Sequence, residues 1–332
     1  MKSHQTRFGV SGKLRSRSIA PCGEVGQSPT VLKVFIFSGK EGESMPEIWF
    51  PNLGIEIMHL DRTAFTLFGK NVYWYGIFIG LAVVIGVWLA LREAKRTGQD
   101  PDQYVDFALY ALVFAVIGAR LYYVIFSWDY YSAHPEKIFA LREGGLAIYG
   151  AVIASILTAI VYSKKKGMDF WLLADTGAPC LIFGQMLGRW GNFFNREAFG
   201  GFTEGLFAMR YPLDDVRAGD LSPDILEHLQ VVNGVEYIQV HPTFLYESLW
   251  NLGVFILLMI LRRHKKFDGE IFGLYLLGYA LGRVWIEGLR TDQLKIGGFA
   301  VSQLLSAGLI VAAICFLVWK WKREKKEHVT EA

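Results

Sequence analysis

Long uncharged stretches alternate with short basic clusters along most of this chain. Residues 72–91 and 301–319 contain no charged side chain, and 243–261 contains only Glu247. A helix needs about 20 consecutive apolar residues to cross a bilayer core. Each stretch is followed by a basic cluster: Arg92–Arg96, Lys320–Lys326 and Arg262–Lys266, respectively. The pattern therefore predicts membrane-spanning helices rather than three buried helices of a large soluble protein.

Four further segments are apolar, and three of them carry polar residues inside. Together these segments predict an all-α integral membrane protein with seven transmembrane helices. The spans lie near 72–91, 104–126, 146–162, 170–187, 243–261, 271–289 and 301–319. Ionisable residues inside a span are costly in lipid and usually face the interior of the bundle. We therefore expect Arg120 and Asp175 to pair with each other across it.

The basic clusters also orient the predicted spans. Lysine and arginine are enriched in the cytoplasmic loops of membrane proteins. With seven spans, all four strong clusters, including Lys164–Lys166, fall on one side of the membrane. This predicts an N-terminus outside and a cytoplasmic C-terminus. The polar loop 200–240 is then a small outward-facing subdomain between spans four and five.

Residues 1–44 fit this orientation least, because they carry seven lysines and arginines on the side predicted to be outside. They contain no long apolar stretch of the kind that a signal peptide needs. We expect this segment to be a disordered or mis-annotated extension, with translation beginning at Met45. The polytopic membrane domain is then 45–332.

The composition narrows the classes of protein further. Hydrophobic residues make up 52% of the chain and charged residues 20%, whereas soluble domains carry about 25% charged residues. The hydrophobicity excludes a disordered chain, and a net charge of +3 is too small for a strongly basic nucleic-acid-binding protein. Three cysteines imply no disulfide framework, and the sequence holds no CxxC or HExxH motif. We expect no metal and no cofactor.

The densest polar segment follows the fourth predicted span, at 188–200. It combines Arg189, Asn192, Asn195 and Glu197 with three glycines. Arginine offers a forked set of donors that suits a phosphate, and glycine permits tight turns and close backbone approach. A polar loop beside the membrane is the simpler interpretation, but such loops rarely place so many donors against an apolar span. The segment is a candidate anion site.

A second basic group lies in and just after the sixth predicted span. Tyr279, Arg283, Glu287 and Arg290 are spaced four, four and three residues apart, which places them on one helix face. Glu287 can pair with Arg283 or Arg290, so a self-neutralised structural ion pair remains an alternative. Two arginines beside one carboxylate leave one positive charge over, which predicts an anionic ligand.

Further candidates lie at the outer ends of other spans. His241 and Glu247 belong to a short motif that opens the fifth span. There His241 is a candidate base or helix cap, and Glu247 is expected to reach the same cavity. Tyr75 and Tyr149 lie near the outer ends of the first and third spans, where anchoring at the membrane interface is the simpler interpretation.

Together these residues resemble one known family. The segment 188–200 matches G-R-x-G-N-F-x-N-x-E-x-x-G, the signature of the prolipoprotein diacylglyceryl transferases, at every fixed position. The family's seven-span topology with an outer N-terminus is similar to the one predicted here, and the resemblance covers roughly 45–332. Further blocks occur in the family's order, at 74–76, 118–120, 144–150, 241–247 and 282–287.

The resemblance implies a transferase of lipoprotein biosynthesis in the bacterial cytoplasmic (inner) membrane, with its active site towards the extracytoplasmic face. Such enzymes move the diacylglyceryl group of phosphatidylglycerol onto the lipobox cysteine thiol of a prolipoprotein. A thioether forms and glycerol phosphate leaves, which is the first step of bacterial lipoprotein maturation. The implied partners are phosphatidylglycerol, prolipoprotein signal peptides with a lipobox cysteine, and the lipid bilayer, with no nucleic acid.

The same resemblance implies roles for individual residues. Arg189 binds the phosphatidylglycerol headgroup, and Arg283 is a second clamp that Glu287 orients. The implied catalytic set is Arg189, Arg283, Glu197, Tyr149, Tyr279, Glu287 and His241. The implied substrate-binding set is Arg189, Asn192, Asn195, Gly200, Tyr75 and Arg290.

One position departs from the family pattern. Well-known members carry a histidine where this chain has Tyr149, and that histidine is often proposed as the base for the cysteine thiol. A phenol with a pKa of about 10 is a poor base at neutral pH. We therefore expect Tyr149 to act by hydrogen bonding. The base remains open between His241, Glu197 and no dedicated residue.

A membrane transporter for an anionic solute is the alternative function, because arginines inside spans suit that role too. Transporters often carry inverted repeats and broken paired helices, and the sequence shows neither. A purely structural membrane protein would not need Arg189, Arg283, Asn192 and Glu197 at one membrane level.

Overall fold

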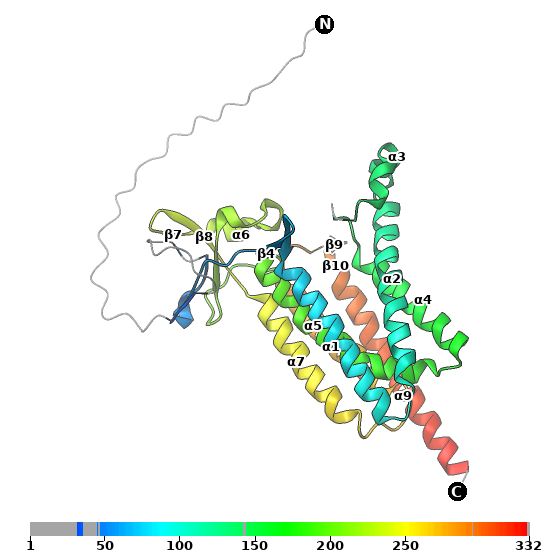
Figure 1. Ribbon diagram of the computed structural model, residues 1–332. Coiled ribbons are helices and arrows are strands. Elements are labelled where there is room, and N and C mark those ends of the chain that lie inside the picture. Colours follow the sequence, from blue (N-terminus) through cyan, green and yellow to red (C-terminus); the bar gives the residue numbers. More distant parts are fainter. Residues whose placement is uncertain (1–31, 36–44, 46, 142–143, 294, 331–332) are drawn as a thin grey trace.

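The structure is a computed structural model that describes residues 32–35, 45, 47–141, 144–293 and 295–330 (Figure 1). The expected extension 1–44 therefore lies almost entirely outside the described residues. Its described part is strand β1 (Leu32–Phe35).

Helices make up most of the described chain, and six of them are long and apolar enough to cross a membrane. The protein is therefore a multi-pass membrane protein, and each of the six helices coincides with a predicted span. They are α1 (Trp74–Arg96), α2 (Pro101–Phe126), α4 (Ile148–Lys166), α5 (Phe170–Asn195), α7 (Thr243–Leu261) and α9 (Val301–Thr330). The remaining predicted span corresponds to α8 (Glu270–Leu289), which carries Arg283 and Glu287 inside it.

Helix α5 differs from its predicted span in a way that matters for the site. The apolar pattern ends near 187, but the helix continues to Asn195. The Asp169 side chain accepts the Leu172 N–H at the start of α5, and Arg196 ends the helix in the left-handed conformation with φ of 53°. Most of the polar segment 188–200 is therefore helical, so Arg189 and Asn192 lie on the last turns of α5 rather than in a loop.

Small residues let the long helices approach one another closely. A Cβ atom on Gly150 of α4 would lie 2.2 Å from the Gly118 carbonyl oxygen of α2. Helix α1 packs on α5, α5 on α7, and α8 on α9. In Figure 1, α2 and α4 lie to one side of α1 and α5, and α7 lies on the other side. Large apolar side chains on the outward faces stay exposed, as contact with lipid requires: Val84, Leu109, Ile125, Ile260 and Val311.

A six-stranded sheet, called the head below, covers one end of the helices, and the hydrophobic pattern did not predict it (Figure 1). Its strand order is β1-β3-β2-β6-β8-β7, with β1 parallel to β3 and the other neighbours antiparallel. The loop 200–240 supplies only half of the strands, and the others precede α1. The strands after β1 are β2 (Ile48–Phe50), β3 (Ile55–Met58), β6 (Met209–Pro212), β7 (Gln230–Val232) and β8 (Val235–Val240).

The core of the head includes the ends of two membrane helices. Tyr211 and Ile238 of the sheet are fully buried, and they share one apolar cluster with Phe193 and Phe194 of α5 and Phe244 of α7. The end of α5 and the start of α7 are therefore held in place by the head. Smaller elements complete the fold: hairpin β4 (Thr63–Leu67) and β5 (Lys70–Tyr73), hairpin β9 (Lys295–Ile296) and β10 (Phe299–Ala300), and helices α3 (Trp128–Ala133) and α6 (Pro223–Glu227).

Candidate active site at the head ends of α5, α7 and α8

Three helices bring two arginines and two glutamates together beneath the head. The Glu247 carboxylate of α7 lies 2.9 Å from the Arg189 guanidinium of α5 and 3.1 Å from that of Arg283 on α8. The Glu287 carboxylate lies 2.6 Å from Arg283. Glu247 and Glu287 are only 3% and 5% exposed. These four residues, called the arginine cluster below, interact in a medium that screens their charges less than water does.

The predicted ion pair between Glu287 and Arg283 is confirmed. The prediction that one positive charge beside Glu287 is left unpaired is wrong. Arg290 pairs instead with Asp292 through two hydrogen bonds of 2.9 and 2.6 Å. Glu247 supplies a further carboxylate from another helix. The helical spacing alone could not reveal these partners, because they lie on α7 and in the turn after α8.

The arginine cluster can still receive an anion. A guanidinium group has five N–H donors in a fixed fork, and a carboxylate occupies only some of them. The Arg189 and Arg283 side chains are 21% and 15% exposed, whereas Glu247 between them is buried. The shared carboxylate thus holds two cationic forks close together with part of each accessible. This arrangement suits a phosphate that accepts hydrogen bonds from both.

The polar segment after Arg189 forms one connected network. Asn192 and Asn195 each donate to the same Glu197 oxygen at 3.1 Å. Arg189 donates to the Asn192 oxygen at 3.3 Å, and Arg217, between strands β6 and β7, lies 3.3 Å from the other Glu197 oxygen. The predicted grouping of these residues is therefore realised, and the network extends the arginine cluster towards the head.

Two glycines of this segment permit contacts that any side chain would block. A Cβ atom on Gly191 would lie 2.4 Å from the Tyr75 ring of α1, so the ring packs closely against the α5 backbone. Gly200 donates its N–H to the His241 carbonyl at 3.0 Å and forms a bridge with Arg290. Gly200 thereby joins the segment after α5 to the start of α7 and the end of α8.

Replacing Gly200 with alanine is expected to lower the free energy of unfolding by about 1–3 kcal/mol. The new Cβ atom would lie 2.8 Å from both the His241 Cβ and the Leu289 carbonyl oxygen, and backbone atoms cannot rotate away. Unfolding in detergent measures the loss. Gly201→Ala is the matched control, because a Cβ there has nothing within 4 Å. Equal stability of the two variants would contradict this account of Gly200.

His241 lies between β8 and α7, where its Nδ1 atom is 3.4 Å from the Tyr246 hydroxyl. Burial lowers the pKa of His241 below its ordinary value, because desolvation disfavours the charged imidazolium. The ring is therefore neutral at neutral pH. A neutral imidazole can accept a proton, so His241 keeps its predicted status as a candidate base.

The lowered pKa of His241 predicts how stability depends on pH. Below an ordinary pKa of about 6.5, the unfolded chain binds a proton that the folded chain does not yet bind. Stability therefore falls as the pH falls through this window. The variant His241→Gln is expected to lose this contribution, so its melting temperature should fall less than that of the wild type between about pH 7 and pH 5. Parallel melting curves for the two proteins would contradict the assignment.

The two tyrosines of the predicted catalytic set lie in different surroundings. Tyr279 precedes Arg283 by one helical turn on α8 and stacks on Tyr275, with ring centroids 6.2 Å apart. Tyr149 lies on α4, its ring 6.4 Å from that of Tyr122 on α2. Among the contacts of the described residues, none joins Tyr149 to the arginine cluster.

A family model described as prolipoprotein diacylglyceryl transferase matches residues 62–319. The chain belongs to the prolipoprotein diacylglyceryl transferase family. Three relatives named phosphatidylglycerol–prolipoprotein diacylglyceryl transferase come from Bacillus cereus, Bacillus anthracis and Bacillus mycoides. Each is 44% identical to this chain over 271 residues, which is 80% of this chain and 94% of the relative. The chain is thus a transferase by family, and the matched range contains every residue of the two predicted sets.

The predicted pair of Arg120 and Asp175 is wrong. Asp175 of α5 accepts the N–H groups of Gly269 and Phe272 at 2.9 Å and lies 3.0 Å from Lys265, so its partners surround the start of α8. Negative charge is favourable at a helix N-terminus, where backbone N–H groups lack partners. A carboxylate in the first turns of α5 therefore anchors a neighbouring helix.

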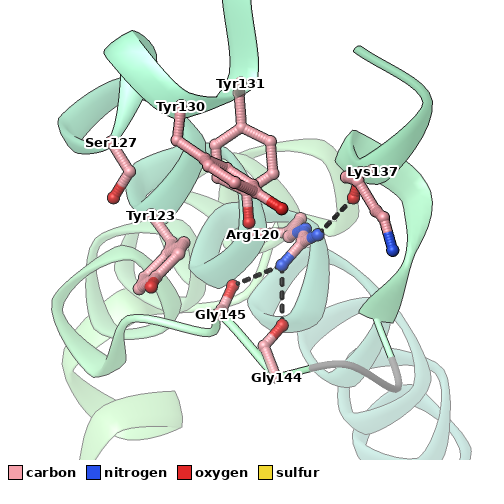
Figure 2. A pocket seen from close by; sticks show the side chains of 8 residues that line it. All are labelled: Arg120, Tyr123, Ser127, Tyr130, Tyr131, Lys137, Gly144 and Gly145. Atoms are coloured by element: carbon pink, nitrogen blue, oxygen red, sulfur yellow. Dashed lines mark hydrogen bonds between the residues drawn. The ribbon is translucent and has the colours of Figure 1, made fainter. Parts of the chain in front are cut away.

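Arg120 lies near the end of α2, whereas Asp175 lies near the start of α5. Backbone carbonyls hold the Arg120 guanidinium (Figure 2). Its guanidinium lies 5.2 Å from the Tyr131 ring centroid, beside a cavity of about 370 Å³. A Cβ atom on Gly145 would lie 2.5 Å from Arg120 Nη1. Arg120 therefore fastens the chain that leads into α4. It donates at 2.6–2.9 Å to four carbonyls, those of Lys137, Ile138, Gly144 and Gly145.

Sequence reasoning missed one buried residue at the end of α5, beside the candidate active site. Arg196 occupies a variable position of the signature, yet it is only 6% exposed. It forms an ion pair with Glu47 and donates to the Leu60 carbonyl at 2.9 Å. Arg196 therefore ties the end of α5 to the strands that precede α1. No spacing could indicate this role, because Glu47 and Leu60 lie more than a hundred residues away.

Proposed function

We propose that this protein transfers the diacylglyceryl group of phosphatidylglycerol to the lipobox cysteine of prolipoproteins. The family and the names of the Bacillus relatives support this reaction. The observation that carries the proposal is the arginine cluster, in which one buried carboxylate holds two guanidinium groups at the ends of three apolar helices. The phosphate of an anionic lipid headgroup lies where apolar membrane helices end, and it accepts bidentate hydrogen bonds from arginine.

The cysteine thiolate attacks the glyceryl carbon that bears the phosphodiester oxygen. A carbon–sulfur bond forms and the carbon–oxygen bond breaks. Its electron pair stays on the phosphate oxygen, and glycerol phosphate leaves. Negative charge therefore builds on the phosphate in the transition state, where Arg189 and Arg283 donate hydrogen bonds to it. The thiol proton passes to His241, Glu197 or water, since a thiol with a pKa of about 8.5 is already partly ionised at neutral pH.

The surrounding residues shape the site. Glu247 and Glu287 orient Arg283, and the network of Asn192, Asn195 and Glu197 receives the hydroxyl groups of the headgroup glycerol. Other predicted residues form walls or nearby hydrogen-bonding groups: Tyr75, Tyr149, Gly200, Tyr279 and Arg290. Neither a metal nor a cofactor takes part in this scheme.

The proposed topology has seven spans, with α8 as the sixth and residues 45–332 as the membrane domain. Glu93 at the end of α1 lies 2.9 Å from Arg262 at the end of α7, so two basic clusters share the end of the bundle opposite the head. Cytoplasmic loops are rich in lysine and arginine. We therefore place that end and the C-terminus in the cytoplasm of a bacterium. The N-terminus, the head as the outward-facing subdomain and the active site then face outwards.

The test is an assay with the purified protein, phosphatidylglycerol vesicles and a lipobox peptide. We expect release of glycerol phosphate and a mass gain of the peptide by one diacylglyceryl group. A peptide with serine in place of the lipobox cysteine is the control and should remain unmodified. Flux of an anionic solute through proteoliposomes without lipid turnover would favour the transporter alternative and contradict the proposal.

A further inference from the structure

A second polar layer lies one helical turn below the arginine cluster, towards the middle of the bundle. Gln185 precedes Arg189 by four residues on α5, and Asn251 follows Glu247 by four residues on α7. Residues four apart share a helix face and differ in depth by about 6 Å. Helix α5 ends at the head and α7 begins there, so the two helices run in opposite directions. Gln185 and Asn251 therefore both lie on the deep side of the Arg189–Glu247 ion pair.

This layer contains buried polar groups without partners. Asn251 is 1% exposed, and its side-chain nitrogen has no hydrogen-bond partner among the described residues. Gln185 donates its side-chain nitrogen to the Tyr275 hydroxyl of α8 at 3.0 Å, and its side-chain oxygen is buried and unpartnered within the described chain. A hydroxyl both donates and accepts, so either end of the Gln185 amide can bind Tyr275 and leave an N–H₂ group available.

Unpaired buried donors are rare in proteins because each one loses its hydrogen bonds to water without replacement. The Asn251 nitrogen and the Gln185 amide therefore point to a ligand with acceptor groups at this depth. These acceptor groups must also be close covalent neighbours of the anion that Arg189 and Arg283 bind. In a phospholipid, the ester carbonyl oxygens lie just beyond the phosphate on the side of the acyl chains, and they accept hydrogen bonds but cannot donate them.

The proposed reaction makes such a subsite useful. Phosphatidylglycerol carries two glyceryl groups on one phosphate, and both present a CH₂–O–P linkage to an attacking thiolate. On the two carbons beyond the reacting carbon, one group carries two esters and the other carries two hydroxyls. The Asn192–Asn195–Glu197 network offers a carboxylate that can accept from hydroxyls, whereas the deep layer offers amide donors that suit esters. The two layers together would orient the lipid so that only the diacylated carbon is attacked.

We propose that Asn251 and Gln185 form a second lipid subsite, which hydrogen-bonds the ester carbonyls of the diacylglyceryl group and selects that group for transfer. This inference rests on the proposed function. Asn251 is a positioning and specificity residue here, because it contacts the donor lipid away from the bonds that change.

The test compares phosphatidylglycerol with its dialkyl ether analogue, which has the same headgroup and phosphate but no ester carbonyls. Wild-type kcat/KM should be roughly 5- to 150-fold lower with the ether lipid, because the buried donors lose their acceptors. In Asn251→Leu this preference should shrink several-fold, because only the Gln185 amide then remains to bind an ester carbonyl. The variant should melt no lower than the wild type, because leucine removes an unpaired polar group and has a similar volume.

Three outcomes would overturn the inference. They are equal use of both lipids by the wild type, an undiminished preference in Asn251→Leu, and a change confined to the KM of the peptide. The wild-type comparison alone decides the matter if the variant does not fold. If the wild type transferred neither lipid to the peptide, the proposed function would fail instead, so the two failures are distinguishable.

Discussion

Replacing Arg189 with alanine is expected to lower kcat for lipid transfer by about 10²- to 10³-fold, the usual loss when one preorganised donor to a developing negative charge is removed. Arg189 lies at the centre of the site, because it contacts both Glu247 at 2.9 Å and the Asn192 oxygen at 3.3 Å. Its loss would leave only Arg283 for the phosphate. Glycerol phosphate release under saturating phosphatidylglycerol measures the effect.

Arg189→Lys separates the contribution of charge from that of geometry. Lysine keeps the positive charge but lacks the planar fork that binds a phosphate through two hydrogen bonds. We expect this variant to remain well below the wild type and above Arg189→Ala. A control at Arg323, whose exposed ion pair with Glu327 lies at the far end of α9, should leave kcat unchanged on conversion to alanine. Wild-type kcat in Arg189→Ala would contradict the role of the arginine cluster.

Replacing Glu247 with glutamine is expected to cost about 3–5 kcal/mol of stability, because removal of one partner leaves buried charges uncompensated. Glu247 is 3% exposed and contacts two guanidinium groups. With a neutral side chain between them, Arg189 and Arg283 would repel each other, and transfer activity should fall with stability. Unfolding in detergent and the transfer assay measure the two effects on the same preparation.

Glu327→Gln is the matched control for Glu247, since it removes a carboxylate from an exposed i,i+4 pair with Arg323. Such pairs contribute only about 0.3–0.5 kcal/mol. A saturating concentration of phosphatidylglycerol should restore part of the stability of Glu247→Gln, because the lipid phosphate would then lie between the two arginines. A Glu247→Gln protein as stable as the Glu327→Gln protein would show that Glu247 does not hold the arginines together.

The helices were accessible from sequence because their signal is local. Each long apolar stretch corresponds to a helix, and α8 coincides with the predicted 271–289 almost residue for residue. The 188–200 signature identified the family through residues that are neighbours in the chain, and the family match over 62–319 confirms that reading. The i,i+4 pair of Arg283 and Glu287 was likewise readable from helical spacing.

The head was not accessible in the same way. Its strands are three to six residues long and come from both sides of four membrane helices. A strand of that length gives a weak periodic signal, and pairing between β2 and β6 joins residues that are about 160 positions apart. Only the folded chain shows that Phe193 and Phe194 of α5 belong to the core of this sheet.

Hydrophobic periodicity and motif spacing thus sufficed for the membrane helices, the family and the identity of the arginines. Three-dimensional packing was needed to find their partners. Arg120 and Asp175 do not meet, Glu247 joins Arg189 to Arg283, and the buried side-chain nitrogen of Asn251 has no hydrogen-bond partner among the described residues. The physical reason is that a charge buried away from water takes whichever opposite charge or backbone dipole packing brings nearest, and that partner is usually remote in the chain.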